Sequence, residues 1–194
     1  MYERGLKRLG QKLTDLGLLD AGQIPVFAYG LDSLLSYLWN YGCLLLIGLA
    51  LGQLPELCLW IVAYTALRQH AGGYHAATRI RCFILSQLIG AACLLAIRVA
   101  PAWLCLGFSV ASVALVFWLA PVEHKNHPLN PTRRARQWKL ARIIACTELL
   151  AVLLCRLWWP LGLAPVAIGM GVAALMMTLA ALLLKLPALL AEKG

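Results

Sequence analysis

Six apolar stretches separated by polar segments are the feature of this sequence that most restricts its fold. Hydrophobic residues make up 62% of the 194-residue chain, against about 45–50% in ordinary globular domains. A soluble chain of this length has no core large enough to bury that much apolar surface. A bilayer accepts it, and an apolar run of about 20 residues spans the hydrocarbon layer as a helix. The sequence therefore predicts an all-α integral membrane bundle, a single domain over residues 1–194.

The expected bundle has about six spans. They cover residues 26–54, 57–67, 82–97, 102–120, 143–159 and 165–184. The 57–67 and 82–97 stretches are the ones we regard as possible re-entrant segments, because irregular backbone is tolerated at membrane depth where protein surrounds it. Trp158 and Trp159, at the end of the fifth stretch, are expected to anchor it at the membrane interface.

The distribution of positive charge predicts the orientation of the chain in the membrane. The net charge is +9, from 17 Lys and Arg against 8 Asp and Glu. In a soluble protein this excess would favour nucleic acid, but here it falls between apolar runs without a nucleic-acid-binding motif. The basic segments are the N-terminus, residues 68–81, residues 122–142 and the C-terminus, and they alternate with short connections of little charge. The positive-inside rule then places both termini and both basic loops in the cytoplasm.

The N-terminal segment, residues 1–22, is predicted to be an amphipathic helix. Its leucines recur at steps of three and four residues among lysines and arginines, which is the periodicity of a helix with one apolar face. It lacks the continuous apolar region of a signal peptide. A basic amphipathic helix at this position typically lies in the membrane interface.

Reactive side chains concentrate in one place, residues 68–82. It contains His75 and, seven residues later, Cys82. A cysteine nucleophile needs a neighbouring base, and positive neighbours such as Arg79 and Arg81 favour its thiolate form. On one regular helix the pair would be about 10.5 Å apart, whereas proton transfer needs about 3 Å. A break in the helix, or closure on the substrate, must therefore bring them together.

The remaining cysteines and histidines are interpreted as structural. The other six cysteines lie in apolar runs, where a free thiol behaves as a small hydrophobe, and we expect no disulfide framework. They are Cys43, Cys58, Cys93, Cys105, Cys146 and Cys155. His124 and His127 have only Glu123 beside them as a further ligand, which is too few for a metal site. We therefore expect neither a metal nor another cofactor.

Two acidic residues, Asp32 and Glu148, lie within apolar stretches. Acids inside a membrane are costly and often functional. Asp32 is expected near the interface, and Glu148 has Arg142 or Arg156 one or two helical turns away. Both residues are interpreted as supporting the site or packing helices together.

The string RQHAGGYHAATRIRC resembles the signature of the AgrB family, the accessory gene regulator B peptidases of bacterial quorum sensing. The family pattern is an arginine, three residues, two glycines, one residue, a His-Ala pair and a cysteine seven positions after the histidine. The matching residues are Arg68, Gly72, Gly73, His75, Ala76 and Cys82. The chain also resembles the family in its length, its basic amphipathic start and the Pro121 that opens a basic loop.

This resemblance implies a membrane cysteine endopeptidase that removes the C-terminal part of a small AgrD-like precursor peptide. Cys82 would be the nucleophile, with His75 as the general base. The resulting Cys82 thioester would be attacked by a thiol or hydroxyl of the peptide to give a cyclic thiolactone or lactone. A membrane-embedded site would protect the thioester from water.

The resemblance also suggests supporting residues and partners. Arg68 would orient the site or bind a substrate carboxylate, and Gln69 and the Gly72–Gly73 pair would support it. The third catalytic residue is open among Gln69, His70 and Glu123. The basic 122–142 loop would determine topology or bind the acidic tail of the precursor. A homodimer in the bacterial plasma membrane is expected.

Two other functions remain open from the residues alone. A small peptide exporter would need a polar pathway through the bundle, yet charges within the apolar stretches are sparse. A non-catalytic scaffold or sensor subunit would leave Cys82 dispensable. Selective reaction of Cys82 with a thiol-reactive peptide probe would argue against both alternatives.

Overall fold

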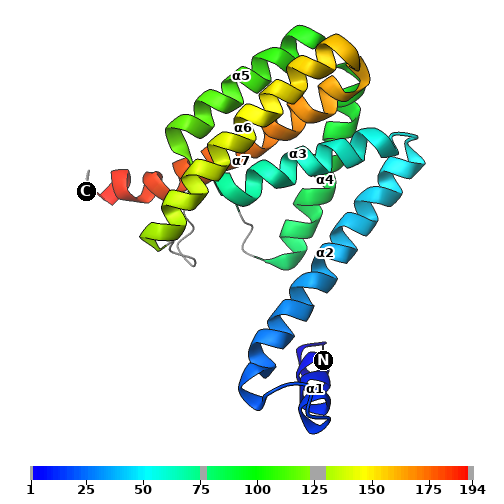
Figure 1. Cartoon of the computed structure of the whole chain (residues 1–194), viewed down its shortest axis with the longest axis vertical. Coiled ribbons are helices and arrows are strands. Elements are labelled where there is room, and N and C mark those ends of the chain that lie inside the picture. Colours follow the sequence, from blue (N-terminus) through cyan, green and yellow to red (C-terminus); the bar gives the residue numbers. More distant parts are fainter. Residues whose placement is uncertain (1, 75–77, 123–129, 192–194) are drawn as a thin grey trace. The chain divides into compact units, whose positions relative to one another are not determined.

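The structure is a computed structural model that describes residues 2–74, 78–122 and 130–191 (Figure 1). Every regular element in these ranges is a helix, which confirms the all-α prediction. The elements are α1 (Tyr2–Asp15), α2 (Ile24–Ala50), α3 (Leu54–Ala71), α4 (Arg79–Val99), α5 (Ala102–Leu119), α6 (Pro131–Trp158) and α7 (Leu163–Ala191), with short 3-10 turns at Ala21–Gln23 and Pro160–Gly162. The chain divides into two units, Met1–Leu46 and Ile47–Gly194, with α2 crossing the boundary.

In the first unit, α1 has the expected amphipathic character. Leu6 is buried, whereas the neighbouring Lys7 and Arg8 are exposed. Gly10 faces Ile24 so closely that an added Cβ would lie 3.0 Å from the Ile24 side chain. The helix is shorter than the predicted 1–22 because the chain turns at Gly17, whose positive φ of 71° does not continue a right-handed helix.

Four helical segments of the described residues are long and apolar enough to cross a membrane. They are Ala21–Ala50, Arg79–Val99, Ala102–Leu119 and Pro160–Leu184. These segments show a membrane protein and correspond to four of the six expected spans. The other two expected stretches, 57–67 and 143–159, are also helical, within α3 and α6. These two helices extend into polar sequence at the end that carries the candidate site, and the total of six spans stays a prediction.

In the second unit, α7 is the central helix, and α3, α5 and α6 all pack against it (Figure 1). Small residues let these helices approach closely, as is typical of membrane bundles. At Gly169 of α7, an added Cβ would lie 2.9 Å from the Ala63 Cβ and 3.1 Å from the Trp60 carbonyl oxygen, both in α3. The α3–α7 contact therefore depends on the absence of a side chain at position 169.

The basic 122–142 segment is only partly the loop that was expected, because α6 already begins at Pro131. Proline suits the first turn of a helix, since its missing N–H has no intrahelical partner there. The helix is further stabilised by Arg142, whose guanidinium lies 3.4 Å from the centre of the Trp138 ring. Arg142 also donates to the Phe117 carbonyl at the end of α5, at 2.6 Å.

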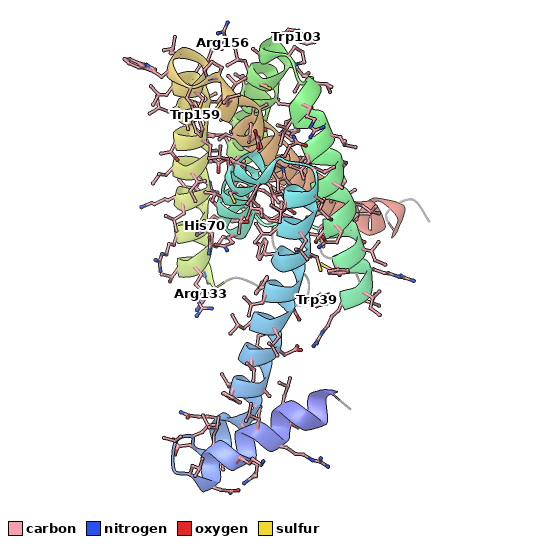
Figure 2. All side chains as sticks on the ribbon, turned by 90° about the vertical axis from the view of Figure 1, so that its right-hand side faces the viewer. Trp39, His70, Trp103, Arg133, Arg156 and Trp159 are labelled. Carbon is pink, nitrogen blue, oxygen red and sulfur yellow. The ribbon has the colours of Figure 1, made fainter. Side chains whose placement is uncertain are left out.

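Exposed tryptophans lie near both ends of α5 and at the eighth and last residues of α6. Figure 2 shows Trp103, Arg156 and Trp159 at one end of this second unit and Arg133 at the other. Trp138 and Trp158 are both exposed, and a helix rises about 30 Å over the 20 residue steps that separate them. This separation equals the typical hydrocarbon thickness, so the tryptophans lie where interface anchors are needed.

Glu148 of α6 provides a stability prediction. It is 8% exposed, and neither carboxylate oxygen has a hydrogen-bond partner among the described residues. Burying an unpartnered polar group costs about 1–3 kcal/mol. We expect Glu148→Met to raise the free energy of unfolding by about this amount, measured by thermal unfolding in detergent. Glu148→Gln, which keeps a buried polar group, should gain less. A lower melting temperature for the methionine variant would contradict the prediction.

Candidate active site

The polypeptide that follows α3 is held by backbone hydrogen bonds to two other elements. The Ala71 carbonyl accepts from the Val122 N–H at 2.9 Å, just beyond the end of α5. The Tyr74 N–H donates to the Met176 carbonyl in α7 at 3.1 Å. Between these two bonds the chain leaves the helix through Gly72. Irregular backbone inside a membrane bundle requires such internal partners, and here they join α3, α5 and α7 around the motif.

The two motif glycines are required because other atoms approach their backbone closely. Gly72 has φ 83° and ψ −173°, a backbone region that essentially only glycine adopts. A Cβ on Gly72 would overlap with the Val122 carbonyl, and one on Gly73 would overlap with the guanidinium of Arg68. The spacing of the motif therefore reflects packing around residues 72 and 73.

Arg68 points toward this same segment. Its Nη2 donates to the Tyr74 carbonyl oxygen at 2.5 Å, and its guanidinium lies over the Tyr64 ring, 5.8 Å from the ring centre. Tyr64 in turn stacks on Trp60, with 5.0 Å between ring centres and 5° between planes. One face of α3 thus presents a row of two aromatic rings followed by the cation.

His70 lies on α3 where this helix faces α6 (Figure 2), and its Nδ1 is 2.6 Å from the Gln137 Oε1. This hydrogen bond joins the end of α3 to the first turns of α6, and which group donates depends on the tautomer of the imidazole. Gln69, between Arg68 and His70, is exposed. Glu123 lies outside the described residues. Sequence reasoning missed Gln137, because nothing in its local pattern distinguishes it from other polar residues.

Cys82 lies in the first turn of α4. Thr78 caps this helix, its Oγ1 accepting from the Arg81 N–H at 3.3 Å. The Cys82 N–H donates to the Thr78 carbonyl at 3.0 Å, and the Ser86 hydroxyl donates to the Cys82 carbonyl at 2.9 Å. Because α3 ends at Ala71 and α4 begins at Arg79, the helix break that a His75–Cys82 pair requires is present.

The exposure of Cys82 differs from that of the cysteine in the equivalent position of α5. Cys82 is half-buried, whereas Cys105, also the fourth residue of its helix, is 1% exposed. A half-buried thiol at a helix end is accessible to a substrate, whereas Cys105 is enclosed by the bundle core. Cys93 is likewise buried within α4. The structure therefore separates Cys82 from the buried thiols of α4 and α5.

The structure thus brings some of the sequence-predicted residues together and leaves others undescribed. Arg68, Gly72 and Gly73 form one packed unit with Tyr74. His75 and Ala76 lie in the range 75–77, and His124 and His127 lie in the range 123–129, both of which are outside the described residues. Within the parts of the chain that are described, no three His, Cys, Asp or Glu side chains gather as metal ligands would.

Comparison with known proteins assigns this chain to a family. The model of the family described as AgrB, Accessory gene regulator B, matches residues 6–186. The searches of curated proteins and of solved structures gave no match. The family match covers nearly the whole chain and includes every residue of the 68–82 motif. The protein therefore belongs to the AgrB family, with a role in processing the peptide precursor of agr quorum sensing.

Proposed function

We propose that the protein is a membrane cysteine endopeptidase in which Cys82 is the nucleophile and His75 the general base. His75 takes the thiol proton, and the Cys82 thiolate attacks the carbonyl carbon of the scissile peptide bond. The C–N bond breaks, and His75 returns the proton to the amine of the departing C-terminal fragment. The N-terminal part of the precursor remains attached to Cys82 as a thioester.

The observation that carries this proposal is the division of the motif between two helices. The arginine and the glycine pair hold the chain that leads to His75, and Cys82 starts a separate helix with a half-buried side chain. This arrangement removes the geometric objection to a dyad on one helix. It also explains why the motif needs glycine at two consecutive positions.

Release from the thioester forms the cyclic product. A thiol or hydroxyl of the bound peptide attacks the thioester carbonyl, the bond to the Cys82 sulfur breaks, and the Cys82 thiol is regenerated. Thiol attack exchanges one thioester for another and needs no external energy source. Water must be kept away during this step, and a site at the edge of a membrane bundle supports such exclusion.

The proposed substrate is an AgrD-like precursor peptide approached from the cytoplasm. The basic first turns of α6 carry exposed cations near the candidate site, and cations there suit an acidic peptide tail. They are Arg133, Arg134, Arg136 and Lys139. The excess of positive charge at this end also favours a cytoplasmic position for both termini. By its resemblance to the family, the working unit is a homodimer.

Trapping the thioester tests the proposal. Purified protein in lipid would be mixed with the precursor encoded beside its gene, in which the internal thiol or hydroxyl is replaced by alanine. Without an internal nucleophile the acyl-enzyme should accumulate, and mass spectrometry should locate the N-terminal peptide fragment on Cys82. Hydroxylamine should release it, as expected for a thioester.

The same experiment separates the alternatives. Cleavage without any adduct on Cys82, or with an adduct on Cys58 or Cys146, which are both exposed, would contradict the mechanism. Transport of intact precursor into sealed vesicles without cleavage would instead support an exporter. The Cys105→Ala variant serves as control, because that buried thiol should leave the adduct on Cys82 unchanged.

A further inference from the structure

We propose that Arg68 is a positioning residue that acts through the Tyr74 carbonyl, and not a ligand for a substrate carboxylate. The inference rests on the proposed function, because it assigns Arg68 a role toward the base, His75. Its basis is the arrangement of Arg68, Gly73 and Tyr74, all of which are described.

The guanidinium of Arg68 forms a hydrogen bond with the protein's own backbone. Its Nη2 donates to the Tyr74 carbonyl, and its Nη1 is buried, with no side-chain or backbone acceptor among the described residues. A hydrogen bond from a charged donor is about twice as strong as a neutral one. With Nη2 engaged in this way, the two terminal nitrogens are not both free for end-on, two-point binding of a substrate carboxylate.

The position of this hydrogen bond connects Arg68 to the base. The Tyr74 carbonyl belongs to the peptide unit that links Tyr74 to His75, and a peptide unit is planar. The hydrogen bond from Arg68 therefore acts on the peptide unit that directly precedes the base. The Tyr74 N–H is fixed as well, by Met176 of α7, so the residue before the base is held on both sides.

Gly73 is part of the same arrangement of Arg68 and Tyr74. The guanidinium of Arg68 occupies the space that a Cβ of residue 73 would need. The overlapping atom is at the end of a flexible side chain, so Gly73→Ala should displace the guanidinium without moving the backbone. Losing Arg68 and adding a methyl group at position 73 should consequently have the same effect on Tyr74.

The Tyr64 ring also contacts the guanidinium. Arg68 lies over Tyr64, which stacks on the buried Trp60. Cation–π contacts of this kind are stronger where water is excluded. The ring row therefore favours the inward orientation in which Nη2 reaches Tyr74.

The test measures how fast iodoacetamide alkylates Cys82 at pH 7 without substrate, with the modified residue located by mass spectrometry. His75→Ala should slow alkylation about 100-fold, the lower range for loss of a general base. Arg68→Gln and Gly73→Ala should each slow it at least about 10-fold although His75 is present. The double variant should be no slower than either single variant, because both remove one interaction. Arg68→Lys, which keeps one donor, should recover part of the rate.

Arg98→Gln is the matched control. Arg98 also donates to a carbonyl just beyond a helix end, that of Leu51, but at the turn between α2 and α3. It should leave Cys82 alkylation within about 2-fold of wild type, as expected for distant independent sites. A slowing by Arg98→Gln as large as that by Arg68→Gln would show a general loss of structure and overturn the inference.

Peptide kinetics distinguish positioning from substrate binding. If Arg68 positions His75, Arg68→Gln lowers kcat and leaves KM nearly unchanged; if it binds substrate, KM rises with kcat retained. The second outcome overturns the inference. Failure of the proposed function looks different, because His75→Ala would then leave both alkylation and cleavage at wild-type rates.

Discussion

Replacing Cys82 by serine is expected to abolish precursor cleavage, lowering kcat by at least about 10³-fold, as removal of a nucleophile does in well-studied proteases. A serine hydroxyl is far less acidic than a thiol, so a base that activates cysteine does not activate serine to the same degree. The measurement is cleavage of the precursor by purified protein in lipid, with product masses to reveal a ring. His75→Ala should lose activity as well.

The control for this prediction is Cys105→Ala. Cys105 is the fourth residue of α5, as Cys82 is of α4, but it is buried. It should retain cleavage, with any effect confined to stability. If the Cys82→Ser and Cys105→Ala variants both cut the precursor as fast as wild type, the thiol mechanism would be wrong. The assignment to the family would still hold, but without a mechanism.

Gly72→Ala is expected to destabilise the protein by about 3 kcal/mol or more, from backbone strain and a broken buried hydrogen bond together. The strain comes from φ 83° at residue 72. The added Cβ would also overlap with the Val122 carbonyl, a backbone atom that cannot rotate away. Relief of this overlap would separate Val122 from Ala71 and break their 2.9 Å hydrogen bond. Thermal or denaturant unfolding in detergent measures the effect.

Comparison with a Gly52→Ala variant distinguishes the effect of backbone strain from the effect of steric overlap. Gly52 also has a positive φ, 66°, but an added Cβ would have no neighbour within 4 Å. The Gly52→Ala substitution should lower the free energy of unfolding by about 1–2 kcal/mol, which is the penalty for an ordinary residue in the left-handed region. Equal losses at the two positions would show that close approach at Gly72 contributes nothing, contrary to the structure.

Much of the fold could be predicted because hydropathy and periodicity are local properties. The all-α membrane class, the amphipathic α1 and the distinctive position of Cys82 follow from short stretches of residues. Predicted boundaries were less accurate. The start of α6 at Pro131 was missed, because the run of cations that follows it suggested a loop, whereas arginine and lysine are good helix formers.

The sequence named candidate residues for the site but not the contacts between them. The motif named Arg68 and the glycine pair, yet it left open whether the arginine orients the site or binds substrate. It also did not reveal that the Val122 carbonyl approaches Gly72, and the Arg68 guanidinium approaches Gly73, too closely for a side chain at either position. Gln137 could not be identified from the sequence, because its only link to the candidate site is a hydrogen bond with His70, which is 67 residues away in the chain.

Composition and periodicity were enough to identify this chain as a helical membrane protein and to single out the polar segment that contains its candidate reactive residues. Transfer of apolar side chains out of water depends on composition and spacing, which can be read one segment at a time. The contacts that hold Tyr74 between Arg68 and Met176, and the pairing of Ala71 with Val122, could be seen only in the folded chain. Such contacts join residues that are distant in sequence, and close packing of side chains selects them among many alternatives that have the same apolar pattern.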